Sequence, residues 1–225
     1  RYEKLTPALY GAVIDEAHKN GLRVTAHVFT LEDAKGLLRA GIDAFAHGIR
    51  DQDVDDELVQ LWTDRPDVVL VPNLPNPGVA LDLSWLSGTI PAERLGEMQA
   101  AQQERPAAQE SFGIQARNLD RLNSAGIKIA FGTDGSSPWT SHQEMEDMVR
   151  SGMTPAEVIV AATRTSAELI ELDAGSIAPG KLADFVILDA NPIDDITNTR
   201  QISDVYMRGQ RVERESLRER WTGSE

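Results

Sequence analysis

The chain has 225 residues, of which 22 are basic and 36 acidic, so its formal net charge is −14. Nucleic-acid binding depends on Lys and Arg displacing counterions from the phosphate backbone, which argues against nucleic acid as a partner. No apolar run approaches the ~18 residues of a membrane span, and residues 1–20 lack a signal-peptide core, so we expect no membrane association and a cytoplasmic location. The chain has no cysteine, so any metal must be held by histidine or carboxylate groups.

The first 134 residues alternate between amphipathic helices and short apolar strands. Threonine or proline at the start of each helical pattern and glycine at its end are typical helix boundaries. The predicted helices span 6–21, 30–41, 54–66 and 114–126, and the strands that follow them span 22–28, 42–47, 67–73 and 127–134. Strands that alternate with helices in this way form a parallel sheet through βα units.

The long interval after the third strand interrupts this alternation. Residues 74–110 are first rich in Pro, Gly and Ser and then polar and helical, with a continuous helical stretch expected at 93–112. Insertions at the carboxyl end of a strand are where α/β folds place binding loops and lids. We therefore expect an insertion or lid at about 74–110. Trp85 favours a segment that packs over a disordered surface excursion.

The pattern of the remaining sequence predicts two further helices, followed by short β segments. Helices are expected at 141–152 and 154–172, and short β segments with turns follow, with a helical tail at the end. We divide the chain into 1–172, a partial (β/α)₈ domain, and 173–225, part of a small β-sandwich domain with a helical tail.

The four predicted strands all end on polar side chains. His27, His47, Asn73 and Asp134 occupy these positions, and the carboxyl ends of parallel strands meet at one edge of the sheet. Two imidazoles and a carboxylate suit Zn²⁺ or a similar ion, which lowers the pKa of bound water to about 7. The alternative for each histidine is a hydrogen-bonded structural role. His18 lies on the polar face of the first helix and is expected at the surface.

The strand end "FGTDG" carries its aspartate between two glycines. The sequence predicts that Gly132 and Gly135 let the backbone open around Asp134. A carboxylate beside a metal-bound water can accept its proton and return it to a leaving group. Asp134 is therefore a candidate for both metal binding and acid–base catalysis.

Several segments together carry a specific resemblance. "TAH", "AGIDAFAHG", "FGTD", "HQEMEDMVRSGMTPAEVIVAATRTSAELI" and "GSIAPGKLADFVILDANPIDDI" resemble the later half of an amidohydrolase-superfamily enzyme. The similarity is to the imidazolonepropionase-like branch, which includes metal-dependent prolidases and other amide hydrolases. Gly-Thr-Asp and "GSIAPGKLADFVILD" are the most specific of these segments.

The resemblance implies an α/β fold, the second half of a (β/α)₈ TIM-type barrel (about strands 5–8) with a small C-terminal β module. By position, His27 and His47 match metal ligands that end the fifth and sixth strands. Asp134 matches the eighth-strand ligand and general base. His142 matches a histidine that contacts substrate or supports the ligands, and we assign it a catalytic role. Its alternative is a polar residue at the start of a helix.

The resemblance also implies that some functional residues of the family have no counterpart in this sequence. The family's first-strand His-x-His pair and its fourth-strand Lys or Glu have no counterpart in the sequence, so we expect a missing N-terminal half of the barrel as a partner, or a homo-oligomer. The leading hypothesis is a Zn²⁺-dependent hydrolase of amide, dipeptide-like or cyclic amide bonds, with substrate contacts from Asn73, Asn76 and Trp85. The alternative is a catalytically incomplete fragment, an assembly or binding half with a weak mononuclear metal site.

Overall fold

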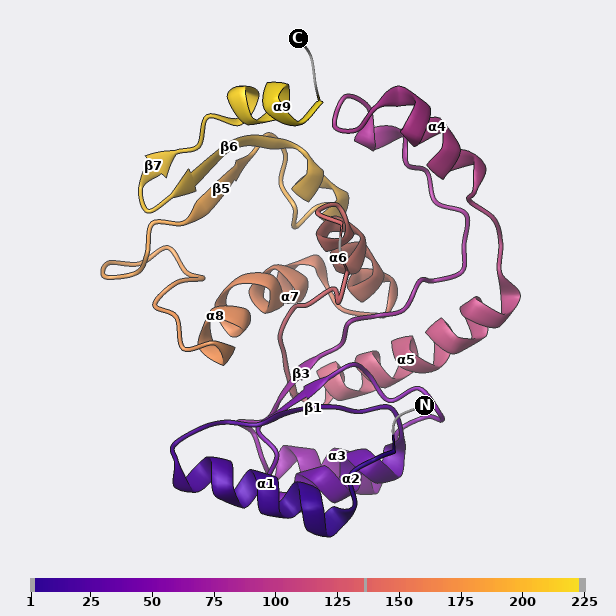
Figure 1. The fold of residues 1–225 in the computed structure, drawn as a ribbon, viewed down its shortest axis with the longest axis vertical. Helices are drawn as coiled ribbons and strands as arrows, with labels where there is room; N and C mark the ends of the chain where they lie inside the picture. Colours follow the sequence, from indigo (N-terminus) through magenta and orange to yellow (C-terminus); the bar gives the residue numbers. More distant parts are fainter. Residues whose placement is uncertain (1–2, 136, 223–225) are drawn as a thin grey trace.

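The computed structural model describes residues 3–135 and 137–222, without the side chains of residues 221 and 222. Of the two predicted domains, residues 1, 2, 136 and 223–225 lie outside the described residues. A parallel sheet and its helices occupy one end of the molecule, and an antiparallel β module the other (Figure 1). No helix in the described part of the chain is long and apolar enough to cross a membrane.

The parallel sheet confirms the predicted alternation of strands and helices. Its strands pair in the order β1-β2-β3-β4, with Ala46 opposite both His27 on β1 and Val71 on β3. The regular ladders are shorter than the predicted strands. They comprise β1 (Thr25–His27), β2 (Ala44–Ala46), β3 (Val69–Val71) and β4 (Lys128–Ile129).

Three helices pack against one face of this sheet (Figure 1). They are α1 (Pro7–Lys19), α2 (Leu31–Ala40) and α3 (Asp56–Thr63). The side chains of Thr30 and Asp55 cap α2 and α3 by accepting backbone N–H groups, and Gly41 ends α2 in the left-handed conformation. Between helices and sheet, Trp62 is buried edge-on against Phe45, with ring centroids 4.8 Å apart.

The segment after β3 contains two helices where the sequence predicts one continuous stretch over 93–112. A short 3₁₀ turn, η1 (Ser84–Leu86), precedes α4 (Ala92–Ala100), and α5 (Pro106–Ser124) begins well before the predicted residue 114. The helical prediction is confirmed on both sides of a break at residues 101–105. The break occurs because Pro106 has no N–H to continue a helix from α4, whereas proline is suited to the first turn of a new one.

Helix α5 is tied to the loop that follows His47. The buried side chain of Asn118 accepts the N–H of Val54 at 2.8 Å and donates to the carbonyls of Ile49 and Gln52, each at 2.9 Å. A buried amide with all of these bonds made holds the loop in one position.

The predicted helix 154–172 is interrupted by a wide turn. It consists of α7 (Pro155–Val160), a π-helical turn η2 (Ala161–Thr165) and α8 (Ser166–Leu169), and it follows α6 (Thr140–Arg150). The Ser166 hydroxyl donates to the carbonyl of Ala161 at 2.7 Å and accepts the N–H of Phe131 at 3.0 Å. The turn is thus stabilised by a bond that also fixes the end of β4.

The C-terminal β module is a three-stranded antiparallel sheet, in the order β5-β6-β7. Its elements are β5 (Phe185–Leu188), the 3₁₀ turn η3 (Ile196–Arg200), β6 (Ile202–Met207), β7 (Gln210–Arg211) and the tail helix α9 (Arg214–Thr222). The turn between β6 and β7 contains Gly209, as the sequence predicts, with φ of 75°.

Candidate metal and active site

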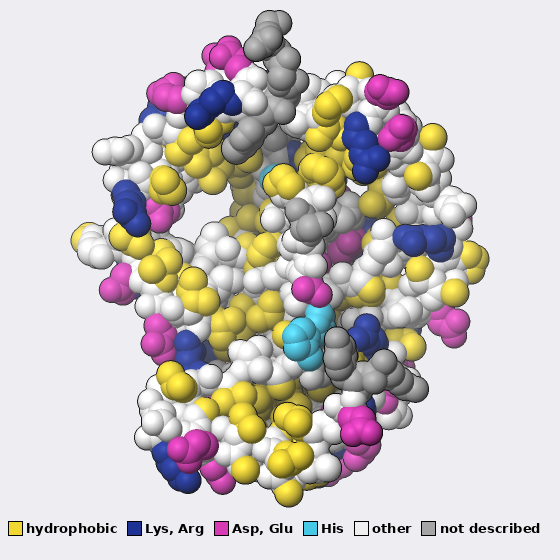
Figure 2. All heavy atoms as spheres, viewed as in Figure 1, with side chains coloured by type: hydrophobic (Ala, Val, Ile, Leu, Met, Phe, Trp, Pro, Cys, Tyr) yellow, Lys and Arg dark blue, Asp and Glu magenta, His cyan; other side chains and the backbone are white. Residues whose placement is uncertain are grey.

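Two histidines from neighbouring strands meet at the carboxyl edge of the parallel sheet. Nδ1 of His27, at the end of β1, lies 2.8 Å from Nε2 of His47, directly after β2. Their rings stack with centroids 4.8 Å apart. Histidine side chains are visible near the middle of the face shown in Figure 2. The structure therefore brings together the first two predicted metal ligands.

His47 is the more enclosed of the two. Its side chain is 15% exposed, and burial, the adjacent His27 and Arg50 lower the pKa of His47, while Asp134 acts in the opposite direction. A lowered pKa keeps this imidazole neutral at pH 7, the form that can donate a lone pair to a metal.

Asp134 lies beside this pair but does not contact it directly. Its Oδ2 is 4.0 Å from Nε2 of His47, and its side chain is 68% exposed. Within residues 3–135 and 137–222, no three His, Asp or Glu side chains are arranged as a complete metal site. The structure thus gathers the predicted donors without bringing all three into ligand geometry.

Three of the four strand ends have left-handed backbone. The φ angles are 72° at His47, 44° at Asn73 and 48° at Asp134. This conformation is unfavourable for residues with a Cβ and concentrates at functional sites. Three such residues lie along the edge of the sheet at which the sequence predicts the site.

The glycines around Asp134 have a different role from the one predicted. Asp134 itself makes the turn, and the glycines permit close packing. A Cβ on Gly132 would lie 2.6 Å from Oδ1 of Asn73, and one on Gly135 would lie 2.7 Å from Oγ1 of Thr140. The space that a side chain would need is occupied by neighbours.

Asn73 has an unpaired polar atom at the same edge. Its Oδ1 is buried and has no hydrogen-bond partner among the described residues, and the close approach of Gly132 leaves the carboxamide little freedom. A buried acceptor without a donor is costly unless something else satisfies it. This supports the prediction that Asn73 faces a ligand.

Phe29 and Arg50 also lie next to the histidine pair, and no sequence pattern predicts their presence there. The Phe29 ring lies 5.3 Å from that of His47, and the Arg50 guanidinium stacks 3.6 Å above Phe29. Both residues are in loops that follow strand ends, and loop side chains have no periodicity from which their contacts could be predicted.

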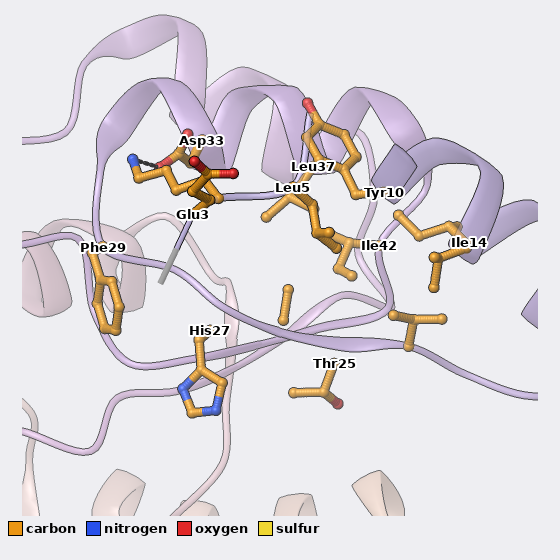
Figure 3. Close-up of a pocket in the computed structure, with 14 residues that line it drawn as sticks. Glu3, Leu5, Tyr10, Ile14, Thr25, His27, Phe29, Asp33, Leu37 and Ile42 are labelled. Carbon is orange, nitrogen blue, oxygen red and sulfur yellow. Dashed lines mark hydrogen bonds and ion pairs between the residues drawn. The ribbon is translucent and has the colours of Figure 1, made fainter. Parts of the chain in front are cut away.

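A largely apolar pocket of about 610 Å³ opens beside β1. Figure 3 shows Leu5, Leu37 and Ile42 converging on one side of β1, whereas Thr25 and His27 point to the other side. Because β1 has one neighbour in the strand order of the described residues, the pocket lies along an open sheet edge.

The remaining predicted site residues lie apart from the histidine pair. Nδ1 of His142, on α6, is 3.1 Å from Oγ1 of Thr199, and its ring meets that of Trp85 edge-on at 5.7 Å. Burial, and then Arg200, lower the pKa of His142. Asn76 accepts the N–H of Gly78 at 2.8 Å and thereby shapes its own loop.

Glu144 fixes the loop directly after Asn73. Its carboxyl oxygens accept the N–H of Leu74 at 3.0 and 3.2 Å in a buried setting. Burial raises the pKa of Glu144 to about 8; the Leu74 N–H opposes this rise and Asp147 adds to it. The group is therefore largely protonated at neutral pH.

Comparison with known proteins identifies the family. The sequence profile of the amidohydrolase family matches residues 4–212. The chain belongs to the amidohydrolase family. It is similar to the imidazolonepropionase of Deinococcus deserti, with 35% identity over 143 residues, 60% of this chain and 36% of that protein.

Solved structures agree with this membership of the amidohydrolase family. A Xaa-Pro dipeptidase with methionine bound in its active site has a TM-score of 0.71 and 26% identity, covering 95% of this chain and 50% of that one. Phenylurea hydrolase B has a TM-score of 0.72 and 26% identity, covering 96% and 48%. The α/β fold therefore matches hydrolases of this family, and the chain spans about half of their length.

Replacing Glu144 with glutamine is expected to change how stability depends on pH. Because its pKa is raised from 4.5 to about 8, the folded protein retains a proton that the unfolded chain releases between these values. Its stabilising contribution is complete below pH 4.5 and is lost as the pH rises to about 8. Glutamine keeps an acceptor for Leu74 and cannot ionise, so the free energy of unfolding of Glu144→Gln should fall less over this range than that of the wild type.

The measurement is urea denaturation at several pH values, with Glu110→Gln as the control because Glu110 is exposed on α5. If Glu144→Gln and Glu110→Gln had the same pH dependence, a protonated Glu144 in the folded protein would be refuted.

Proposed function

We propose that this chain carries part of the active site of a metal-dependent hydrolase of amide-type C–N bonds. The observation that carries the proposal is the direct approach of His27 to His47 at the ends of adjacent parallel strands, with Asp134 4.0 Å from His47. Its fold and family membership are shared with hydrolases.

The donor chemistry fits a divalent cation. Imidazole nitrogen and carboxylate oxygen are common ligands of Zn²⁺, which we take as the metal, and of related ions. The lowered pKa of His47 and the Oδ1 of Asn73, which has no hydrogen-bond partner among the described residues, fit residues that bind a cation and its substrate. Asp134 is exposed and can reach toward the pair by rotating its side chain.

When bound, a divalent ion would activate water as a nucleophile near neutral pH. Residues of this chain would bind the ion, and one of them would transfer the proton of the attacking water. Asp134 accepts the proton of the attacking water on a carboxylate oxygen and returns it to the leaving nitrogen. His27 and His47 would hold the ion through ring nitrogens, and burial lowers the pKa of His47, which favours its neutral form.

The proposed substrates are small molecules that contain an amide, dipeptide-like or cyclic amide bond. The names of the similar proteins, an imidazolonepropionase, a Xaa-Pro dipeptidase and a phenylurea hydrolase, support this class. Asn73, Asn76 and Trp85 are the proposed substrate contacts, and His142, beside Trp85, is proposed to contact the substrate or support these residues. Asn73 has the strongest support, because its Oδ1 has no hydrogen-bond partner among the described residues.

We propose that surface from outside the described residues completes the site. The open edge of β1 and its apolar pocket lie beside His27, and the solved relatives are about twice as long as this chain. We propose that an N-terminal half-barrel pairs with β1, covers the pocket and supplies the remaining ligands. The present chain would then correspond to strands 5–8 of an amidohydrolase barrel.

A second candidate function follows from the incomplete geometry. Because no three donors form a site within the described ranges, the 225-residue chain can instead act as a binding or assembly half with a weak mononuclear metal site. Metal content and hydrolysis, measured on the same samples, separate the two functions.

We expect the chain to retain Zn²⁺ after dialysis and to lose it in His27→Gln and His47→Gln, while the matched control His18→Gln keeps it. His18 pairs with Asp43 at 2.9 Å, away from the site. With the N-terminal half-barrel bound, Asp134→Asn is expected to lower hydrolysis of Xaa-Pro dipeptides or aryl ureas by about 10²-fold or more, because the proton acceptor is lost.

Metal analysis by mass spectrometry and initial rates with added Zn²⁺ provide the measurements. Near wild-type turnover in Asp134→Asn would show that the general-base assignment is wrong. Retained Zn²⁺ without hydrolysis in any assay would favour the binding or assembly function.

Association at the β1 edge is tested by two leucines of similar exposure. Leu5 (59% exposed) lines the pocket, and Leu9 (55% exposed) lies outside it. We expect Leu5→Lys, but not Leu9→Lys, to weaken binding of a separately expressed N-terminal half-barrel, because lysine places a charge in the apolar groove.

Titration calorimetry, with light scattering for self-association, measures this difference. Equal effects of the two substitutions would show that the pocket is not the docking surface. Self-association that Leu5→Lys abolishes would identify a second copy as the occupant instead.

A further inference from the structure

Residues 79–104 form a loop whose two ends are closed on each other. The carbonyl of Gly78 accepts the N–H of Arg105 at 2.7 Å and Nε2 of Gln109 at 3.1 Å. Gly78 has φ of 74°, and a Cβ there would lie 2.7 Å from the Arg105 carbonyl oxygen. The base of the loop is thus a tight crossing that favours glycine.

The loop also contains internal hydrogen bonds, which connect its parts to one another. Gln99 on α4 accepts the N–H of Leu83 at 2.8 Å and donates to the carbonyl of Leu81 at 3.0 Å. These bonds join the segment around η1 to α4. The loop is therefore a small substructure with a narrow base.

On its far side, the loop contacts α6 and η3 through the ring of Trp85. The guanidinium of Arg200, in η3, stacks over the ring of Trp85 at 4.2 Å and forms an ion pair with Glu146 on α6. The Arg200 side chain is 20% exposed and that of Glu146 15%. A partly desolvated cation over an indole face is a strong form of this interaction.

The same cluster includes His142. Its ring meets Trp85 edge-on, and its Nδ1 lies 3.1 Å from Oγ1 of Thr199, the residue before Arg200. Three segments that are distant in sequence, the loop, α6 and η3, therefore meet at Trp85. Arg200 connects them because it contacts both Trp85 and Glu146.

A second contact joins the loop to the C-terminal module. Arg218 on α9 donates through Nε to the carbonyl of Gly88 at 2.7 Å. In Figure 1, α9 and the α4 region lie next to each other at the top of the molecule. The module beyond residue 173 thus contacts the loop through both η3 and α9.

We propose that residues 79–104 are a lid hinged at Gly78 and Arg105, and that Arg200 latches it by clamping Trp85 against α6. The lid starts after the end of β3 and reaches α6, the helix that follows Asp134, through Trp85. Arg200 is a positioning residue: it fixes Trp85 and His142 without belonging to the histidine pair. The C-terminal module thereby holds the lid against α6.

The test is hydrogen exchange of the intact 225-residue chain, read by mass spectrometry. In Arg200→Gln, amides of 79–104 should exchange at least about tenfold faster because the latch is lost, while peptides from α2 stay unchanged. Arg200→Lys keeps a cation and should restore part of the protection. Arg164→Gln is the matched control, because Arg164 is exposed on η2.

A spectroscopic signature distinguishes a latch from general loosening. With 5-fluorotryptophan incorporated, the ¹⁹F resonance of Trp85, assigned through Trp85→Phe, should shift in Arg200→Gln and not in Arg164→Gln. Trp85→Leu should open the lid as Arg200→Gln does, and the double variant should add little to either change.

The proposal is overturned if 79–104 keeps wild-type protection in Arg200→Gln, or if protection is lost equally throughout the chain. If Arg200→Gln does not fold, Trp85→Leu decides by the same criteria. Neither measurement depends on metal or hydrolysis, so failure of the lid and failure of the proposed enzymatic function are distinguishable.

Discussion

The parallel pairing of β1, β2 and β3 is the constraint on which the rest of the structure depends. The ladder continues beyond the regular strands: the N–H of His47 donates to the carbonyl of Val71 at 2.9 Å, and that of Gly48 to Pro72 at 3.1 Å. The register places Ala46 opposite His27, and the next residue, His47, leaves the strand with a left-handed backbone, φ 72°. Pairing and this local turn together account for the contact of the two rings at 2.8 Å.

The helix-covered face of the sheet and its carboxyl edge have different roles. On the helix side, apolar side chains such as Phe45 and Trp62 are fully buried and stabilise the fold. At the carboxyl edge, left-handed residues and an unpaired amide oxygen are retained at an energetic cost. Buried polar groups from distant helices, among them Asn118 and Glu144, fix the loops at this edge. These hydrogen bonds make the loops around the strand ends rigid.

Much of this arrangement was predictable from sequence because it depends on local periodicity and strand ends. The parallel sheet and the meeting of His27 with His47 follow from such signals. The predicted role of Gly132 was wrong, because its close packing against Asn73 depends on the position of a neighbouring strand. The cluster of Trp85, His142 and Arg200 could not be foreseen, since three distant segments meet there without any shared pattern. The break before Pro106 could have been predicted from proline chemistry alone.

The central claim is that His27 and His47 together bind a divalent metal at the carboxyl edge of the sheet. Long-range ¹H–¹⁵N spectra of the imidazoles during Zn²⁺ titration test it directly, because the four histidines serve as internal controls. We expect the resonances of His27 and His47 to move together at stoichiometric Zn²⁺ while those of His18 and His142 stay in place. Unchanged His27 and His47 resonances, or shifts confined to His18 and His142, would contradict it.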